Sequence, residues 1–169
     1  MHKKRHPIIL MLNILIFFFT LLFSNTNILT FSIKTASPLL ILPLLTAFAI
    51  YHSPLSSALT GLVCGIFMDT VAADSYCFNA ILLLVIGGFA SFAANNLFNK
   101  NIQSAVVLSL INCVFYFVLL WLFFHTNNVS ITDSAIYLLR YSLPSAVLSA
   151  IFILPLYYVY KHFNKITSE

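Results

Sequence analysis

The chain has 169 residues, of which 61% are hydrophobic and only 7% are charged, and its mean hydropathy is +1.00. A soluble domain carries about 25% charged residues, so this composition excludes a protein whose whole surface faces water. The net charge of +4 comes from Lys and Arg at the ends of apolar runs, which is typical of membrane anchoring and not of nucleic-acid binding. We therefore expect one integral membrane domain, 1–169, with the lipid bilayer as its solvent.

The chain contains a succession of apolar runs. Each run is close in length to the roughly 20 residues that a helix needs to cross a bilayer. The first, 8–23, comes after three basic residues, and we interpret it as a retained helix because no A-x-A cleavage site follows; a signal peptide is the alternative. The further predicted spans are 36–51, 55–71, 76–98, 102–124 and 143–160. The predicted fold class is thus all-α, a polytopic bundle of six transmembrane helices.

Prolines and polar residues predict the bends and turns between these spans. Pro43 in the second span and Pro155 in the sixth predict kinks, because proline has no N–H to donate to the preceding turn. The very short turn at 52–54 predicts that the second and third spans form an antiparallel hairpin. Asp74 or Ser75 is the expected N-cap of the fourth span.

The basic residues predict the orientation of the bundle. Cytoplasmic loops carry an excess of Lys and Arg, and with six spans one side holds most of the eight basic residues of the chain. That side holds Lys3, Lys4, Arg5, Lys100, Lys161 and Lys165. Only Lys34 and Arg140 fall on the other side, so we expect both termini in the cytoplasm. A five-span arrangement would move Lys161 and Lys165 outside and lose the bias.

A stripe of small residues runs along the third span and ends in an acid. The residues spaced four apart are Ser53, Ser57, Gly61, Gly65 and Asp69. This spacing places them close to one helix face, and a small-xxx-small pattern lets two helix backbones approach closely. The other two of the four glycines, Gly87 and Gly88, lie in the fourth span. The stripe therefore predicts either a seam between the third and fourth spans or a surface for a partner helix.

Asp69 is the one carboxylate within a predicted span. A charge in hydrocarbon is costly, and the C-terminal end of a helix disfavours an anion, so its carboxylate needs hydrogen-bond donors. The backbone amides of 70–75, the start of the fourth span, or a partner protein could supply them. Asp69 is accordingly a candidate loop organiser, a candidate partner-recognition residue, or a candidate ion or proton relay.

Catalytic and cofactor-binding patterns are absent from the sequence. The predicted spans contain no second acidic residue that could pair with Asp69 for acid–base chemistry. The sequence contains no G-x-S-x-G nucleophile elbow and no phosphate-binding glycine loop. The histidines fall at termini or predicted loops, and the three cysteines lack metal-ligand spacing. We therefore expect a protein that is not an enzyme and binds no metal or cofactor.

Residues 37–80 resemble the rod shape-determining protein MreD family of bacteria. The resemblance rests on Pro38, which opens an apolar second span, and on the G-x-x-x-G-x-x-x-D pattern formed by Gly61, Gly65 and Asp69. Family members often carry glycines four and eight residues after the aspartate. Here those positions are Ala73 and Cys77, which resist a positive φ, so the loop after Asp69 is where this chain departs from the family.

The resemblance implies a fold similar to the membrane substrate-binding subunits of energy-coupling-factor vitamin transporters. It also implies a non-catalytic scaffold in the bacterial cytoplasmic membrane, part of the elongasome that supports lateral peptidoglycan synthesis and rod cell shape. The implied partners are an MreC-like membrane protein, the MreB filament, and a RodA-type glycosyltransferase with its penicillin-binding transpeptidase. Under this hypothesis Ser57, Gly61, Gly65 and Asp69 build the packing that presents a surface to MreC.

The alternative function is a vitamin-binding membrane subunit of a transporter. Such a pocket needs several convergent polar groups on apolar walls. The candidate residues are Asn79, Asn95, Asn96, Gln103 and Asn112, which share no obvious face. The first span, 8–23, also contains no alanine, whereas transporter subunits of this class dock their energising partner through an alanine-spaced face.

Overall fold

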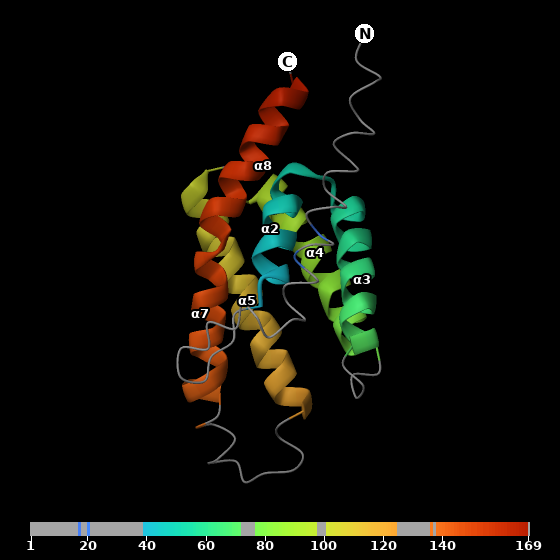
Figure 1. The fold of residues 1–169 in the computed structure, drawn as a ribbon, viewed down its shortest axis with the longest axis vertical. Helices are drawn as coiled ribbons and strands as arrows, with labels where there is room; N and C mark the ends of the chain where they lie inside the picture. The colour runs from blue at the N-terminus through green and yellow to red at the C-terminus, as the bar shows by residue number, and fades with distance from the viewer. Residues whose placement is uncertain are drawn as a thin grey trace.

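The computed structural model describes residues 39–71, 77–97, 101–124 and 138–168, together with Phe17, Thr20 and Ile136. Every regular element in these ranges is helical, which confirms the all-α prediction. Figure 1 shows the helices running roughly alongside one another as a bundle. The elements are α2 (Ile41–Tyr51), α3 (Pro54–Val71), α4 (Phe78–Asn96), α5 (Ile102–Phe124), the π-helix η2 (Leu138–Ser142), α7 (Leu143–Ile151) and α8 (Ile153–Ser168). The predicted span 8–23 lies outside the described residues, apart from Phe17 and Thr20.

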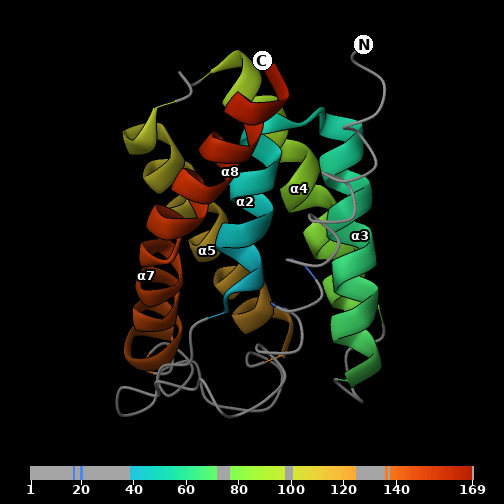
Figure 2. The ribbon, with the colours of Figure 1, turned by 45° about the horizontal axis from the view of Figure 1, so that its top comes forward.

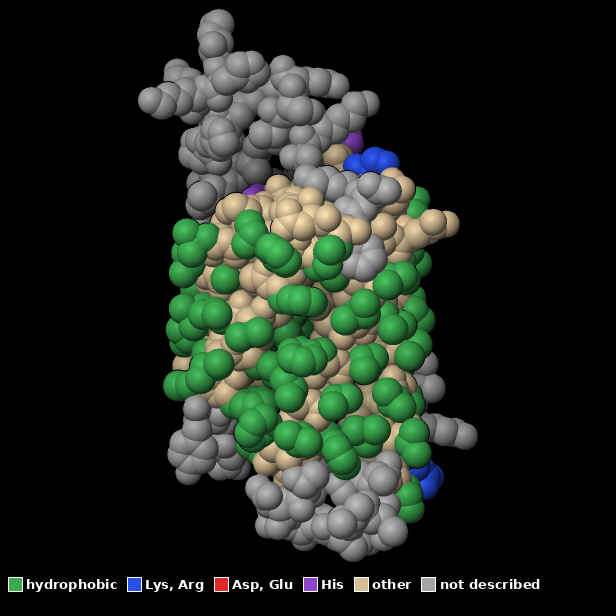
Figure 3. Space-filling view, turned by 180° about the vertical axis from the view of Figure 1, so that it is seen from behind, with side chains coloured by type: hydrophobic (Ala, Val, Ile, Leu, Met, Phe, Trp, Pro, Cys, Tyr) green, Lys and Arg blue, Asp and Glu red, His purple; other side chains and the backbone are tan. Residues whose placement is uncertain are grey.

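Among the described residues, three helical stretches are long and apolar enough to cross a membrane: Phe78–Asn96, Ile102–Phe124 and Leu138–His162. Figure 3 shows apolar side chains spread over the middle of the molecule, with Lys and Arg at its two ends. Large side chains such as Ile81, Phe89 and Phe115 are exposed on these helices. A continuous apolar surface of this kind is unfavourable in water and suits the hydrocarbon core of a bilayer.

Helix α2 is the centre of the bundle. It has only 11 residues, a length of roughly 16 Å, and its residues from Ile41 to Ile50 are all buried. It packs against α3, α4, α5, α7 and α8, and Figure 2 shows it between the α3–α4 pair and the remaining helices. A helix that is apolar on every side is buried by its neighbours. The predicted span 36–51 therefore corresponds, within the described residues, to a short core helix.

The two prolines predicted to kink helices behave differently. Pro43 is the third residue of α2, so the predicted kink there is wrong: an N–H in the first helical turn has no intrahelical acceptor to lose. Pro155 does interrupt the sixth predicted span. α7 ends at Ile151 and α8 begins at Ile153, two residues before the proline. Because Pro155 has no N–H, the carbonyl of Ile151, four residues earlier, lacks its helical donor.

The predicted short turn between the second and third spans is confirmed, because α2 ends at Tyr51 and α3 begins at Pro54. The turn is tied to α4 through the carbonyl oxygen of His52. Ser91 Oγ donates to this oxygen at 2.6 Å and Asn95 Nδ2 at 3.4 Å. The pKa of the His52 imidazole is lowered, because burial disfavours its charged form. The ring hydrogen bond to the Phe48 carbonyl, at 2.9 Å, opposes this effect only in part.

Polar side chains join helices inside the apolar core. Asn112 Nδ2 of α5 donates to Thr46 Oγ1 of α2 at 3.2 Å, and both side chains are buried. The backbone N–H of Leu39, just before α2, donates to Ser149 Oγ of α7 at 2.8 Å. Such interhelical hydrogen bonds contribute about 0.6 kcal/mol on average in a membrane protein. They hold α2 in register with the helices around it.

Candidate functional site at the α3–α4 interface

The stripe of small residues on α3 packs against α4 in an antiparallel register. The backbone of Ser57 lies against Gly87, Gly61 lies against Leu83, and Gly65 lies against Asn79 and Ala80. Each step of four residues along α3 is thus matched by a step of four residues back along α4. Ser53 lies immediately before α3 and accepts a backbone hydrogen bond from Ser57 N at 3.0 Å. Within the described residues, the stripe forms an intramolecular seam.

The glycines of this seam have no room for a side chain. A Cβ atom on Gly61 would lie 2.7 Å from the carbonyl carbon of Leu83, and one on Gly65 would lie 2.5 Å from the Asn79 oxygen. Both obstacles are backbone atoms of α4, which cannot rotate out of the way as a side chain would. Gly88, by contrast, would place a Cβ at an ordinary 3.5 Å from the nearest atom, Ala58 Cβ. Close backbone approach, and not flexibility, is therefore what Gly61 and Gly65 contribute.

Asp69 ends the seam by capping the first turn of α4. Its Oδ1 accepts from the Asn79 backbone N–H at 3.2 Å and from Asn79 Nδ2 at 2.9 Å, and its Oδ2 accepts from Ala80 N at 2.9 Å. The first N–H groups of a helix have no intrahelical acceptor and carry the positive end of the helix dipole. The carboxylate, which sits unfavourably at the end of α3, is thus placed favourably at the start of α4.

The cap extends to α5 through Asn79. The Tyr116 hydroxyl donates to Asn79 Oδ1 at 2.7 Å, while the amide nitrogen of the same Asn79 side chain donates to Asp69. Tyr116 is 1% exposed. Asn79 therefore links the carboxylate of α3 to the tyrosine of α5 and fixes the α3–α4 pair against the rest of the bundle. Tyr116 could have been suspected from the sequence, because its hydroxyl lies in the apolar second half of α5.

Residue 77 takes the place that was expected for Asp74 or Ser75. Cys77 is the residue preceding α4, it makes no side-chain capping hydrogen bond, and its backbone is left-handed with φ 60° and ψ 19°. It is the one non-glycine residue with positive φ in the described part of the chain. Asp74 and Ser75 lie outside the described residues; the N-cap position itself is held by Cys77, and the side-chain oxygens that accept from the first turn of α4 come from Asp69 in the preceding helix. A left-handed backbone costs a residue with a Cβ about 1–2 kcal/mol.

Three of the five polar residues suggested for a ligand pocket are hydrogen-bonded within the protein, and the other two, Asn96 and Gln103, are exposed. Asn79 bonds to Asp69 and Tyr116, Asn112 bonds to Thr46, and Asn95 donates to Ser91 Oγ at 3.2 Å as well as to the α2–α3 turn. Among described residues, no group of three His, Cys, Asp or Glu lies together as metal ligands would. The buried Ser57 Oγ has no hydrogen-bond partner in the part of the chain that is described, so its contribution to the seam is its small size.

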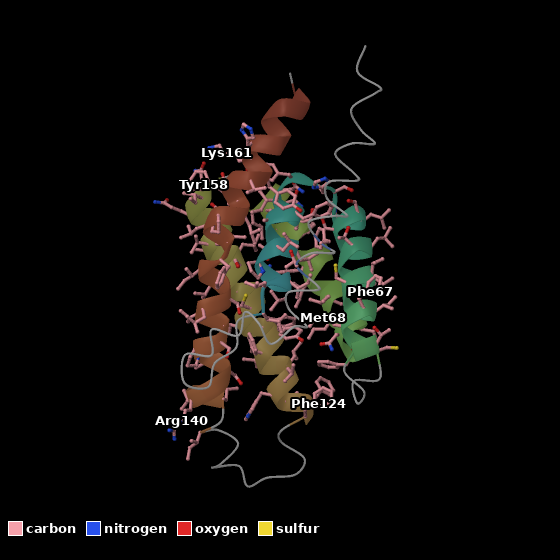
Figure 4. All side chains as sticks on the ribbon, in the orientation of Figure 1. Phe67, Met68, Phe124, Arg140, Tyr158 and Lys161 are labelled. Atoms are coloured by element: carbon pink, nitrogen blue, oxygen red, sulfur yellow. The ribbon has the colours of Figure 1, made fainter. Side chains whose placement is uncertain are left out.

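Helix α3 has two unlike faces. Its inner face packs chiefly on α4 and less on α2. Its outer face is apolar and exposed, and Figure 4 shows Phe67 pointing outward while its neighbour Met68 turns towards the bundle. The exposed residues of this face, spaced three and four apart, are Leu55, Leu59, Val63, Ile66 and Phe67. The seam therefore holds an apolar ridge at the edge of the bundle.

The comparison with protein families gave one match that covers nearly the whole chain. The family model described as rod shape-determining protein MreD matches residues 4–166. Neither the comparison with curated proteins nor the comparison with solved structures gave a match. The match includes the region of the first predicted span, 8–23, and the C-terminal helices, so it extends well beyond the glycine–aspartate motif.

We expect Gly65→Ala to lower the free energy of unfolding by about 3 kcal/mol, because the new Cβ pushes the α4 backbone away. Gly88→Ala is the matched control in the partner helix. It should be neutral or stabilising by up to about 1 kcal/mol, since alanine favours a helix and its Cβ would lie at an ordinary van der Waals distance of 3.5 Å from Ala58 Cβ. Unfolding of both variants in detergent measures the difference. Equal stability of the two variants would contradict the close contact.

A double-mutant cycle tests the link through Asn79. Asp69→Asn should cost about 1–3 kcal/mol, because a carboxylate oxygen that accepts from an amide becomes an NH₂ group, and Tyr116→Phe about 1 kcal/mol. The two side chains share Asn79, so the double variant should depart from additivity by at least about 0.5 kcal/mol. Strictly additive unfolding free energies would show that the two bonds form independently.

Cys77→Gly should stabilise the protein by up to about 1 kcal/mol, because glycine adopts a left-handed backbone without strain and only its greater unfolded-state freedom opposes the gain. Cys64→Gly serves as the control, since Cys64 is buried within α3 and its loss leaves a cavity. The melting temperature in detergent should rise for the first variant and fall for the second. A fall for both would mean that the Cys77 side chain contributes more than its backbone strain costs.

Proposed function

Since the chain belongs to the rod shape-determining protein MreD family and has a role in rod cell shape, we propose that it is a non-catalytic scaffold of the bacterial elongasome. In this role it supports lateral peptidoglycan synthesis by binding an MreC-like membrane protein. The observation that carries the proposal is the family match over residues 4–166. The interior described above suits a positioning role, because the side chains of Asp69, Asn79, Tyr116 and Asn112 form hydrogen bonds that join helices.

The docking surface for the MreC-like partner is the outer face of α3. This face is apolar, and the seam with α4 holds it at the edge of the bundle through backbone contacts at Gly61 and Gly65. A ridge that is held rigidly loses little conformational freedom on binding. Asp69 acts indirectly in this mechanism: it fixes the start of α4 and hence the angle at which α3 is presented.

The proposal includes the topology and the assembly. The protein has six membrane spans in the bacterial cytoplasmic membrane with both termini in the cytoplasm, supported by the distribution of basic residues, and a fold like that of energy-coupling-factor substrate-binding subunits. Through the MreC-like protein it associates, directly or indirectly, with the MreB filament and with a RodA-type glycosyltransferase and its penicillin-binding transpeptidase. Family membership alone supports association with the cell-shape machinery.

Site-directed cross-linking in the bacterial membrane tests the docking surface. In a variant whose native cysteines are replaced by alanine, we expect Leu59→Cys and Ile66→Cys on α3 to cross-link to the MreC-like protein. Leu110→Cys is the matched control, because Leu110 is exposed and apolar on α5, which lies away from this face. Complementation of rod shape shows that each variant is functional.

Cross-linking from Leu110→Cys but not from α3 would move the docking surface to another helix while leaving the scaffold role intact. The scaffold role itself would be contradicted if none of the three positions cross-linked and the wild-type protein failed to co-purify with the MreC-like protein. Retention of rod shape after loss of the protein would contradict a role in shape.

A further inference from the structure

The sixth predicted span is interrupted, unlike the other long helices in the described part of the chain. α3, α4 and α5 are each continuous, whereas Leu138–His162 is divided into η2, α7 and α8. Where α7 meets α8, the Phe152 N–H donates to the Ser149 carbonyl, three residues back, at 3.2 Å. Pro155 has no N–H to donate to the Ile151 carbonyl. Regular helical hydrogen bonding is therefore lost near the middle of this stretch.

The two halves of this stretch are attached to the bundle in different ways. α7 packs chiefly on α5, and its Ser149 Oγ accepts from the backbone N–H of Leu39 at 2.8 Å. α8 packs chiefly on α2 through the buried rings of Tyr157 and Tyr160, and the Tyr160 ring centroid lies 6.1 Å from that of Phe48. Figure 2 shows α7 beside α5 and α8 leaning across α2. A tyrosine side chain can change rotamer as its helix moves, so the contacts of α8 tolerate displacement better than the backbone contact of α7.

The hydroxyl of Tyr160 is buried in this position of α8 without compensation. Tyr160 is 2% exposed, and its hydroxyl oxygen has no hydrogen-bond partner among the described residues. A buried hydroxyl that has lost its water and gained no partner disfavours that arrangement by about fivefold or more. The next residue, Lys161, is exposed, and Figure 4 places it at this end of the bundle. A small outward displacement of α8 would therefore bring the hydroxyl to the level of water and lipid headgroups, where tyrosines are enriched.

We propose that residues 151–155 form a hinge about which α8 pivots between the packed position and an outward position in which the Tyr160 hydroxyl is hydrated. Because helical hydrogen bonds are already missing at the hinge, α8 can bend there without breaking others, while α7 stays on α5. The packed position gains ring contacts with α2 and loses the hydration of one hydroxyl, so the two positions compete. This conformational change goes beyond the proposed scaffold role and does not depend on a partner.

Distances between spin labels on the full-length protein in lipid nanodiscs test the hinge. In a variant whose native cysteines are replaced by alanine, labels at Tyr158→Cys and Phe92→Cys report the position of α8 relative to α4, since both residues are exposed. Labels at Val147→Cys and Phe92→Cys report the position of α7 in the same way. We expect two distances for the α8 pair and one for the α7 pair.

Pro155→Ala restores the N–H that the Ile151 carbonyl lacks, so it should convert the two α8 distances into one. Pro144→Ala is the matched control in the same stretch. Pro144 is exposed in the first turn of α7, where proline is tolerated, so its replacement should leave both α8 distances in place.

Tyr160→Phe removes the unpaired hydroxyl and should raise the ratio of the packed to the outward position about fivefold, without lowering the melting temperature. Tyr116→Phe makes the same change at a hydroxyl that is hydrogen-bonded, so it should lower the melting temperature. The proposal would be overturned by a single α8 distance before any of these replacements, or by two distances that persist in Pro155→Ala. A melting temperature lowered as much by Tyr160→Phe as by Tyr116→Phe would also overturn it, because the Tyr160 hydroxyl would then be bonded in the packed position.

Discussion

The close approach of the α3 and α4 backbones is the contact on which the other features of the bundle depend. In a bilayer, lipid tails solvate apolar side chains as well as another helix does, so association must come from tight packing and from hydrogen bonds. Gly61 and Gly65 permit the packing, because each faces backbone atoms of α4 where a Cβ would collide. The same approach brings the Asp69 carboxylate within 2.9 Å of the Ala80 amide. The cap therefore requires the glycines, and the cap in turn fixes the register of the seam.

The α3–α4 pair is connected to the other helices at both of its ends. At one end, the Asp69–Asn79 bond continues to Tyr116 of α5. At the other, Ser91 of α4 donates to the His52 carbonyl in the turn after α2. Two attachments about a helix length apart prevent the α3–α4 pair from rotating against the other helices. A single attachment would not prevent this rotation. The proposed scaffold role needs this resistance, and the side chains of Asp69, Asn79, Tyr116 and Ser91 provide it.

The sequence was sufficient for the features that depend on local spacing and not for those that depend on distant partners. Four-residue spacing on α3 pointed to a helix-packing stripe ending in Asp69, and Pro155 pointed to the interruption before α8. By contrast, Tyr116 lies 37 residues from its acceptor Asn79, and Asn112 lies 66 residues from Thr46, so no local pattern relates them. The N-cap of α4 was missed for a similar reason. Cap motifs assume an acceptor beside the helix start, whereas here the acceptor comes from the previous helix.

The position of α2 at the centre of the bundle has a consequence for biogenesis. During synthesis α2 emerges before α4, α5, α7 and α8, the helices that later surround it. Until they arrive its neighbours are lipid tails, which its apolar surface tolerates on every side. The hydroxyl of its buried Thr46 already donates to the Leu42 carbonyl at 2.9 Å within the same helix. The hydroxyl oxygen remains available as an acceptor, so the Asn112 side chain finds a partner as soon as α5 is inserted.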